Sequence, residues 1–298
     1  MIIKGIFPAL VTPFNSDESV ALAAVKANIQ RYNHTGLAGY VVLGSTGEAV
    51  MLSRDEADSI LSAVKEVAAP DKLLIAGTGA ESTADTVART KRAAALGYQV
   101  ALVKTPYYYK PMYRAETYLH HYRAVADASP LPILLYSVPQ FTGITLETPE
   151  ILKLSEHPNI VGIKDSSGNV QRIGEVVASV RPDFSVLTGG AAVVYPVLSV
   201  GGRGAILALA SALPEKCAEL FDLAQRGRHP EATQLQLQLV QASKCILSDG
   251  GIPGVKYAMD LRGYEGGASR RPLLPISDST KQSIATLLSQ LHPAAARV

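Results

Sequence analysis

The chain has 298 residues, of which 47% are hydrophobic and 18% charged, and its formal net charge is +2. So small a charge, without any basic run longer than a pair, argues against a nucleic-acid or membrane-surface partner. No stretch approaches the roughly 18 apolar residues of a membrane span, and no secretory pattern opens the chain. We therefore expect a cytoplasmic protein, with no nucleic acid and no membrane as partner.

Short apolar runs alternate with helical segments up to about residue 210. The amphipathic stretches 54–68 and 82–97 illustrate the helical segments. Continuously apolar strands that alternate with helices are typical of a parallel sheet covered on both faces. Eight such units predict an α/β fold of the (β/α)8 TIM-barrel type, with an open doubly wound sheet as the alternative. The candidate strands are 5–12, 39–44, 72–77, 99–104, 132–137, 160–165, 185–189 and 204–209.

Beyond residue 210 the strand pattern stops and only helical patterns follow. Turn residues such as Gly250 and Gly263 separate them. We predict a barrel over residues 1–225 that carries the active site, and a C-terminal helical region over 226–298 that packs on it. The predicted helices are 214–226, 229–248, 253–262 and 278–291.

The ends of the predicted strands carry hydroxyls, phenols and lysines, but no histidine and few carboxylates. No HExxH pattern occurs, the six histidines are scattered, and Cys217 and Cys245 form no metal-ligand spacing. No phosphate-binding GxxxxGK[ST] and no complete GxGxxG is present. We therefore predict no metal and no cofactor. A lysine surrounded by phenols and hydroxyls suits imine chemistry on a carbonyl compound.

Lys164 closes the apolar run 160–163 and is one of two candidates for the reactive amine. A free lysine has a pKa of about 10.4, and enzymes lower that value by desolvation or by a neighbouring cation. Asp165 comes next on the strand, so its side chain should point to the opposite face. A lysine that reaches into solvent is the plainer interpretation. Lys104 also ends an apolar strand, although the VKTP sequence favours a turn that directs it outward.

The turn Gly44–Glu48 places two hydroxyls and several free amides ahead of a helix. Such a turn suits a carboxylate or a phosphate, although a simple helix-capping turn has the same features. We interpret Glu48 as structural. Tyr108 and Tyr136 could each relay a proton, or each could be a packed ring with one satisfied hydroxyl.

Six segments in order give the chain a resemblance to a known family over essentially its whole length. They are GSTGE (44–48), AGTGAEST (76–83), TPYYYKP (105–111), LLYSVPQFTG (134–143), VGIKDSSGN (161–169) and GGRGAI (201–206). Together they resemble the dihydrodipicolinate synthase / N-acetylneuraminate lyase family of class I aldolases. The resemblance implies a (β/α)8 barrel with a C-terminal helical region, assembled as a homotetramer built from two tight dimers.

The resemblance also implies roles for individual residues. Lys164 would form the Schiff base with pyruvate, which decides between it and Lys104. Tyr136 would transfer protons near the imine. Ser45 and Thr46 would bind the pyruvate carboxylate and take part in the proton relay. Tyr108 would complete that relay from the neighbouring subunit.

Further positions bear on the substrate. By resemblance, Gly189 and Ile206 line the pyruvate pocket. The synthases of this family carry a carboxylate-binding arginine where this chain has Phe141, and a phenyl ring cannot replace a guanidinium. The segments YSVPQFTG and GIPGVKYAMDLRGYEGG resemble instead the 4-hydroxy-2-oxoglutarate aldolase branch, in which Ser166 would hold the second carboxylate. Thr46 departs from that branch, because its turn reads GSNGE whereas GSTGE is shared with sialic acid lyases.

The sequence therefore predicts a pyruvate-forming aldolase acting on a small acidic 4-hydroxy-2-oxo acid, such as 4-hydroxy-2-oxoglutarate, to give pyruvate and glyoxylate. A dihydrodipicolinate synthase that condenses pyruvate with aspartate semialdehyde through a different carboxylate anchor is the first alternative. A non-catalytic barrel that binds a small molecule is the second, and the retention of Lys164, Tyr136 and Tyr108 argues against it.

Overall fold

Parallel strands form the centre of the structure, a computed structural model that describes residues 1–291. In that part of the chain the eight strands follow one another around the sheet in sequence order, with β1 next to β8. They are β1 (Gly5–Pro8), β2 (Gly39–Val42), β3 (Leu73–Gly77), β4 (Val100–Lys104), β5 (Ile133–Ser137), β6 (Ile160–Asp165), β7 (Ser185–Thr188) and β8 (Gly204–Leu207).

Hydrogen bonds between β1 and β2 close the sheet into a barrel. The amide of Ala38 donates to the carbonyl of Ile6 at 2.9 Å, and the amide of Leu10 donates to the carbonyl of Val41 at 3.0 Å. A parallel bridge also pairs Ala9 with Val41. The (β/α)8 barrel predicted from the sequence is therefore confirmed, and the open doubly wound alternative is wrong.

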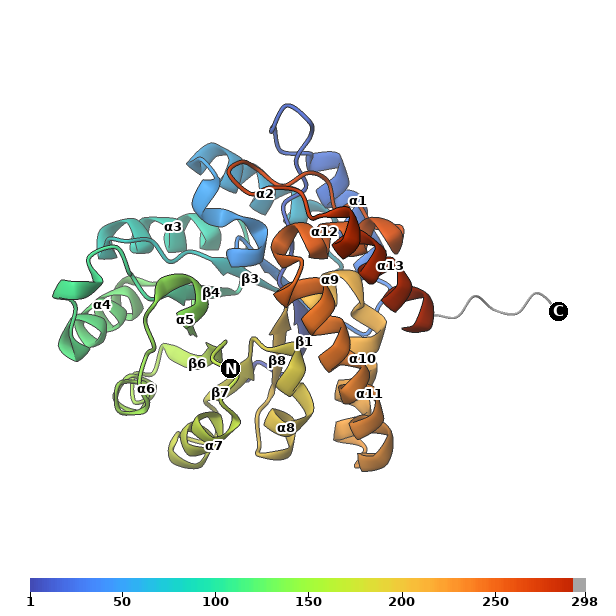
Figure 1. Cartoon of the computed structure of the whole chain (residues 1–298). Coiled ribbons are helices and arrows are strands. Elements are labelled where there is room, and N and C mark those ends of the chain that lie inside the picture. Colours follow the sequence, from blue (N-terminus) through green and yellow to red (C-terminus); the bar gives the residue numbers. More distant parts are fainter. Residues whose placement is uncertain (292–298) are drawn as a thin grey trace.

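The helices surround the strands, and those of the C-terminal part of the chain lie together on one side (Figure 1). They are α1 (Leu22–Tyr32), α2 (Arg54–Val67), α3 (Thr83–Ala95), α4 (Ala115–Ala128), α5 (Pro139–Thr142), α6 (Thr148–Ser155), α7 (Val170–Ser179), α8 (Val194–Ser199), α9 (Leu209–Ala212), α10 (Pro214–Gln225), α11 (His229–Ala242), α12 (Gly251–Leu261) and α13 (Asp278–Leu291). Side-chain caps mark several of their starts: Ser53 and Glu56 form a capping box at α2, and Ser82 caps α3.

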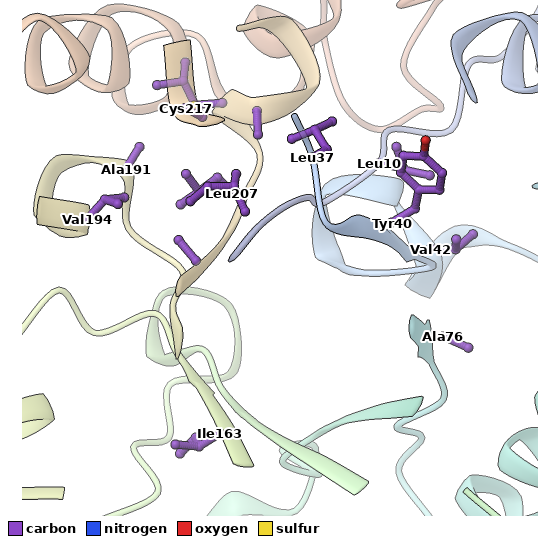
Figure 2. Close-up of a cluster of buried hydrophobic side chains, with 14 of the residues drawn as sticks. Leu10, Leu37, Tyr40, Val42, Ala76, Ile163, Ala191, Val194, Leu207 and Cys217 are labelled. Carbon is purple, nitrogen blue, oxygen red and sulfur yellow. The ribbon is translucent and has the colours of Figure 1, made fainter. Parts of the chain in front are cut away.

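Two apolar layers result from the alternation of side chains along the strands. The outer layer fills the space between strands and helices, and Figure 2 shows part of it, including Tyr40 and Val42 on β2 and Cys217 on α10. The inner layer fills the barrel, as expected for this fold. Its members include Phe7, Val41, Ile75, Leu102, Leu134, Tyr136, Leu187 and Ile206.

Several predicted elements differ from the structure at their ends, and three of them are informative. The predicted strand 5–12 ends at Pro8, and the predicted strand 204–209 ends at Leu207 because α9 begins two residues later. A short apolar run does not distinguish a strand from a buried helical turn, so the sequence could not locate that break. The predicted helix 229–248 is α-helical only to Ala242, and Ser243–Ser248 forms a π-helix.

The C-terminal helices pack against the barrel. Helix α11 contacts α8 and α10, and α12 contacts α9 and α13. The division of the chain after residue 225 stays a prediction, and residues 292–298 of the predicted helical region lie outside the described residues. The segment between α12 and α13 returns to the barrel, where Phe14 and Ala268 exchange backbone hydrogen bonds of 3.4 and 3.1 Å.

Arg270, in this returning segment, binds the start of α2. Its guanidinium contacts both carboxylate oxygens of Glu56, at 3.0 and 2.5 Å, and the carbonyl of Met51 at 2.8 Å. The hydrogen bonds from Arg270 lower the pKa of Glu56 to about 2 from an ordinary value of 4.5. The pair therefore stabilises the fold above pH 4.5, and its contribution disappears as the pH falls towards 2.

Replacing Glu56 with Gln removes this charge but retains a side chain that can complete the capping box. We expect Glu56→Gln to lower the free energy of unfolding at pH 7 by about 1 kcal/mol, since water screens a partly exposed pair. Urea denaturation of both proteins from pH 7 to pH 3 measures the effect. The difference between them should shrink as the pH falls below 4.5; a difference that stays constant over this range would show that the ion pair does not stabilise the fold.

Candidate active site

Lys164 lies near the carboxyl end of β6, inside the barrel, and is 4% exposed. Asp165 points to the opposite side of the strand, as the alternation predicts, and there it forms a buried ion pair with Arg172 of α7. Asp165 also accepts a hydrogen bond of 2.7 Å from the amide of Ser167. Among residues 1–291, no carboxylate oxygen lies within 4.0 Å of the Lys164 amine. The carboxylate nearest to it in sequence is therefore held by another cation.

Tyr136 lies beside Lys164 on the neighbouring strand β5, where the two residues are in register. The Lys164 Nζ atom is 4.2 Å from the centroid of the Tyr136 ring. The Tyr136 hydroxyl lies 3.4 Å from the hydroxyl of Ser45. An amine, a phenol and an alcohol thus follow one another across the mouth of the barrel, which is an arrangement suited to proton transfer.

Ser45 belongs to a tight turn after β2 that contains the short 3-10 helix η1 (Ser45–Gly47). Thr12 stabilises the turn, because its hydroxyl donates a hydrogen bond of 2.7 Å to the Gly47 carbonyl. Ser45 and Thr46 are both half-buried. The hydroxyl of Thr46 has no hydrogen-bond partner within the described part of the chain.

Gly189 follows β7 and makes room for the residues around Lys164. A Cβ atom at this position would lie 1.9 Å from the Ser166 hydroxyl oxygen and 3.2 Å from Cε of Lys164. No residue with a side chain could occupy it without displacing Ser166. Ile206 of β8 is fully buried in the inner apolar layer together with Tyr136. The structure thus brings Ser166, Gly189 and Ile206 into the region of Lys164.

Tyr108 is the predicted site residue that lies outside this cluster. Its side chain is 72% exposed, and its ring packs edge-on against Tyr109. Glu81 holds the loop in place, because one of its oxygens accepts hydrogen bonds of 2.9 Å from the amides of both Tyr107 and Tyr108. Within residues 1–291, Tyr108 therefore completes no relay with Lys164 of its own chain.

Lys104 lines a cavity of about 420 Å³ that also reaches Ser45 and Tyr136. The outward orientation expected from the turn after Lys104 is wrong, because the residue has the same strand parity as Leu102 of the inner layer. Its amine lies 3.2 Å from Glu81. Burial alone would raise the pKa of Glu81, but the amide hydrogen bonds and the charge of Lys104 outweigh burial and lower it. The Lys104 amine therefore forms an ion pair with a carboxylate, whereas the Lys164 amine has no carboxylate within 4.0 Å in residues 1–291.

Two residues near the site had no signal in the sequence. The side-chain amide of Gln140 donates to the carbonyl of Ser166 and so joins the loop after β5 to the loop after β6. Glu81 holds the loop of Tyr108 across 27 positions of sequence. Neither contact has a local pattern, because each depends on strand ends that the fold brings together.

Two further findings concern the described residues as a whole. No group of three or more His, Cys, Asp or Glu side chains in residues 1–291 is placed to hold a metal ion. None of the helices in the same range is both long enough and apolar enough to cross a membrane.

Curated relatives match the chain along nearly its full length. The 4-hydroxy-tetrahydrodipicolinate synthase of Exiguobacterium sp. is 33% identical over 288 residues, covering 97% of this chain and 98% of the relative. A protein named probable 4-hydroxy-2-oxoglutarate aldolase, mitochondrial, from Emericella nidulans is 36% identical over 295 residues, covering 97% of this chain and 95% of the relative.

Solved structures also match the chain along nearly its full length. A dihydrodipicolinate synthase from Bacillus anthracis superimposes with a TM-score of 0.92 at 28% identity, over 97% of this chain and 99% of the other. The chloride-inhibited dihydrodipicolinate synthase from Acinetobacter baumannii, solved in complex with pyruvate, gives a TM-score of 0.92 at 30% identity, over 96% of this chain and 98% of the other.

The family model described as the dihydrodipicolinate synthetase family matches residues 2–291. The family predicted from the six sequence segments is thereby confirmed, and its relatives are lyases that carry out aldol chemistry. This chain belongs to the dihydrodipicolinate synthetase family.

Proposed function

We propose that the protein is a class I aldolase that cleaves a small acidic 4-hydroxy-2-oxo acid, such as 4-hydroxy-2-oxoglutarate, to pyruvate and glyoxylate. The observation that carries the proposal is the buried Lys164 amine, which faces the Tyr136 ring at 4.2 Å and has no carboxylate within 4.0 Å in the described chain. A buried amine without a counter-ion is suited to attack a ketone. The pyruvate complex of the Acinetobacter baumannii relative supports pyruvate as a ligand of the proposed site.

The proposed reaction begins when the Lys164 amine adds to the C2 ketone of the substrate. The carbinolamine loses water and becomes a protonated imine, which draws electrons from the C3–C4 bond. That bond breaks as the C4 hydroxyl loses its proton, and glyoxylate leaves. The remaining enamine takes a proton at C3, and water then hydrolyses the imine to release pyruvate and regenerate the amine.

Proton transfer is assigned to Tyr136 and Ser45, whose hydroxyls lie 3.4 Å apart. Ser45 and Thr46 would also bind the carboxylate next to the ketone, because their turn presents hydroxyls at the mouth of the barrel. Gly189 and Ile206 would form the wall of the pocket for the methyl end of pyruvate. Among these proposed roles, that of Ser45 links carboxylate binding to proton transfer.

Two positions beyond the lysine bear on the choice of the second substrate. Phe141, on α5, is 63% exposed and carries no charge, so it cannot bind the carboxylate of aspartate semialdehyde as the synthase arginine does. Ser166 lies next to Gly189, and its backbone carbonyl accepts a hydrogen bond from the side-chain amide of Gln140. We propose that the Ser166 hydroxyl binds the carboxylate of glyoxylate.

A dihydrodipicolinate synthase is the second candidate, because several of the similar curated relatives carry that name. A different cation would then have to replace the arginine. Lys110 is the candidate for this role, since its Nζ atom lies 3.0 Å from where a Cβ atom on Gly143 would be, and Gly143 directly follows α5, the helix that carries Phe141. This candidate predicts condensation of pyruvate with aspartate semialdehyde and little cleavage.

The exposure of Tyr108 supports an oligomer in which this residue serves a neighbouring subunit. Tyr109 and Met112 are also strongly exposed in the same loop region, and an apolar surface of this kind is typical of an interface. We propose a homotetramer of two tight dimers, with Tyr108 completing the relay in its partner. A cytoplasmic location stays a prediction.

Lys164→Met should abolish turnover, with a loss of about a thousandfold or more, because Met fills the space of the lysine but cannot form an imine. Lys104→Met is the comparison and should cost no more than about tenfold, since its ion pair only supports the loop of Tyr108. Pyruvate release from each purified variant gives the measurement, and thermal unfolding verifies that both fold. Loss of turnover in Lys104→Met alone would contradict the assignment.

A substrate panel separates the two candidate functions. We expect release of pyruvate from 4-hydroxy-2-oxoglutarate and at least about a hundredfold lower kcat/KM for condensation with aspartate semialdehyde, because this chain lacks the arginine that binds the aspartate semialdehyde carboxylate in the synthases. Phe141→Arg should raise the condensation activity and lower the cleavage activity. Condensation alone, abolished by Lys110→Met, would establish the synthase instead.

Mixing two inactive variants tests the origin of Tyr108. Lys164→Met and Tyr108→Phe each lack one part of the proposed site, but a mixed dimer contains one complete site if Tyr108 acts across the interface. After dissociation and reassembly of equal amounts, about a quarter of the sites should regain activity. If Tyr108 acts within its own chain, the mixture will be no more active than the average of its parents.

A further inference from the structure

A second buried lysine, Lys256 on α12, is 2% exposed and takes no part in the proposed reaction. Its Nζ atom lies 2.6 Å from a carboxylate oxygen of Glu48, which is itself fully buried. The same amine donates to the carbonyl of Thr12 at 2.7 Å and to that of Ala268 at 2.6 Å. Three oxygen partners therefore hold this amine in one place.

Glu48 is the last residue of the turn that carries Ser45 and Thr46, and its backbone is in the left-handed region, with φ of 54°. Leu43, the residue just before the turn, has φ of 61°. Residues other than glycine rarely adopt this conformation, and it persists only where surrounding contacts impose it. The turn thus lies between two unfavourable backbone conformations that require an external support.

Lys256 supplies that support by two routes. Through its ion pair it fixes the Glu48 side chain, whose other oxygen accepts a hydrogen bond of 2.9 Å from the amide of Arg270. Through the carbonyl of Thr12 it fixes a second residue, and the Thr12 hydroxyl bonds the Gly47 carbonyl within the turn at 2.7 Å. Both routes end on the turn. The ion pair ends at Glu48, its last residue, and the Thr12 hydrogen bond ends at Gly47, the residue before it.

A role in stability alone does not account for this arrangement. A buried ion pair often contributes little net stability compared with apolar residues of similar volume, because both charges lose their hydration. What such a pair provides is a defined geometry, since each buried charge must keep its partner. The geometry it defines here is that of the turn next to Lys164.

We propose that Lys256 is a positioning residue for the reaction, and that through Glu48 and Thr12 it sets the conformation in which Ser45 and Thr46 bind the carboxylate of the keto acid. This inference rests on the proposed function for the identity of the ligand. It assigns the C-terminal helix α12 a part in substrate binding, although none of its residues is proposed to touch the substrate.

The test compares Lys256→Met with Lys244→Met, which removes an exposed lysine from the same C-terminal region. Lys256→Met should raise the KM for the keto acid by about tenfold or more and lower kcat by a smaller factor, because the turn carries both the carboxylate-binding hydroxyls and Ser45 of the proton relay. Lys244→Met should leave both constants unchanged. Unaltered KM in a folded Lys256→Met variant would overturn the proposal.

Glu48→Gln provides a second variant in case Lys256→Met does not fold, since it keeps a hydrogen-bond acceptor but loses the charge. It should raise the KM by a smaller factor. The double variant should be no worse than Lys256→Met alone, because both substitutions remove the same link. Additive effects of the two substitutions would contradict a shared route through Glu48.

A crystal structure of Lys256→Met, or of Glu48→Gln if the first does not fold, gives a readout that does not depend on activity. We expect Leu43 or Glu48 to leave the left-handed region and the distance between the Ser45 and Tyr136 hydroxyls to increase. An unchanged turn would refute the positioning role even if the KM of the variant is raised. Calorimetric binding of pyruvate to the wild-type protein tests the proposed function separately: without such binding the function fails, while the structural result still decides the role of Lys256.

Discussion

The alternation of side chains along β6 is the constraint on which the site depends. It places Lys164 inside the barrel and Asp165 outside, where Arg172 binds the carboxylate. A shift of one residue would exchange the two and place a carboxylate in the pocket. Because strand pairing with β5 sets this register, the same constraint brings the Tyr136 ring beside the amine. The chemistry is thus a consequence of how one strand is paired.

The two buried lysines illustrate how surroundings determine what a side chain does. Lys256 has a carboxylate at 2.6 Å and two carbonyl partners, so it holds structure in place. Lys164 faces an aromatic ring and has no such carboxylate in the described chain, so it is left for chemistry. Residue type and burial are the same at both positions. The difference lies in the partners that the barrel and α12 supply.

Periodicity and strand parity predict the barrel, the place of Lys164 at the end of its strand and the opposite direction of Asp165, whereas the choice of Lys164 over Lys104 rests on the family resemblance. They were insufficient where distant segments meet. The contact of Lys256 with Glu48 joins residues more than 200 positions apart, and no local sequence pattern indicates it. The turn after Lys104 favours an outward direction, but the strand parity of Lys104 directs it into the barrel. The end of β8 was missed because the apolar run continues into α9.

Covalent trapping tests the central claim, that Lys164 forms an imine with a keto acid, most directly. The protein is incubated with pyruvate and borohydride, and the digested chain is then mapped by mass spectrometry. Reduction of the imine should add the three-carbon acid to the peptide that contains Lys164 and leave the peptide with Lys104 unmodified. A protein that gains no mass, or gains it at another lysine, would contradict the account.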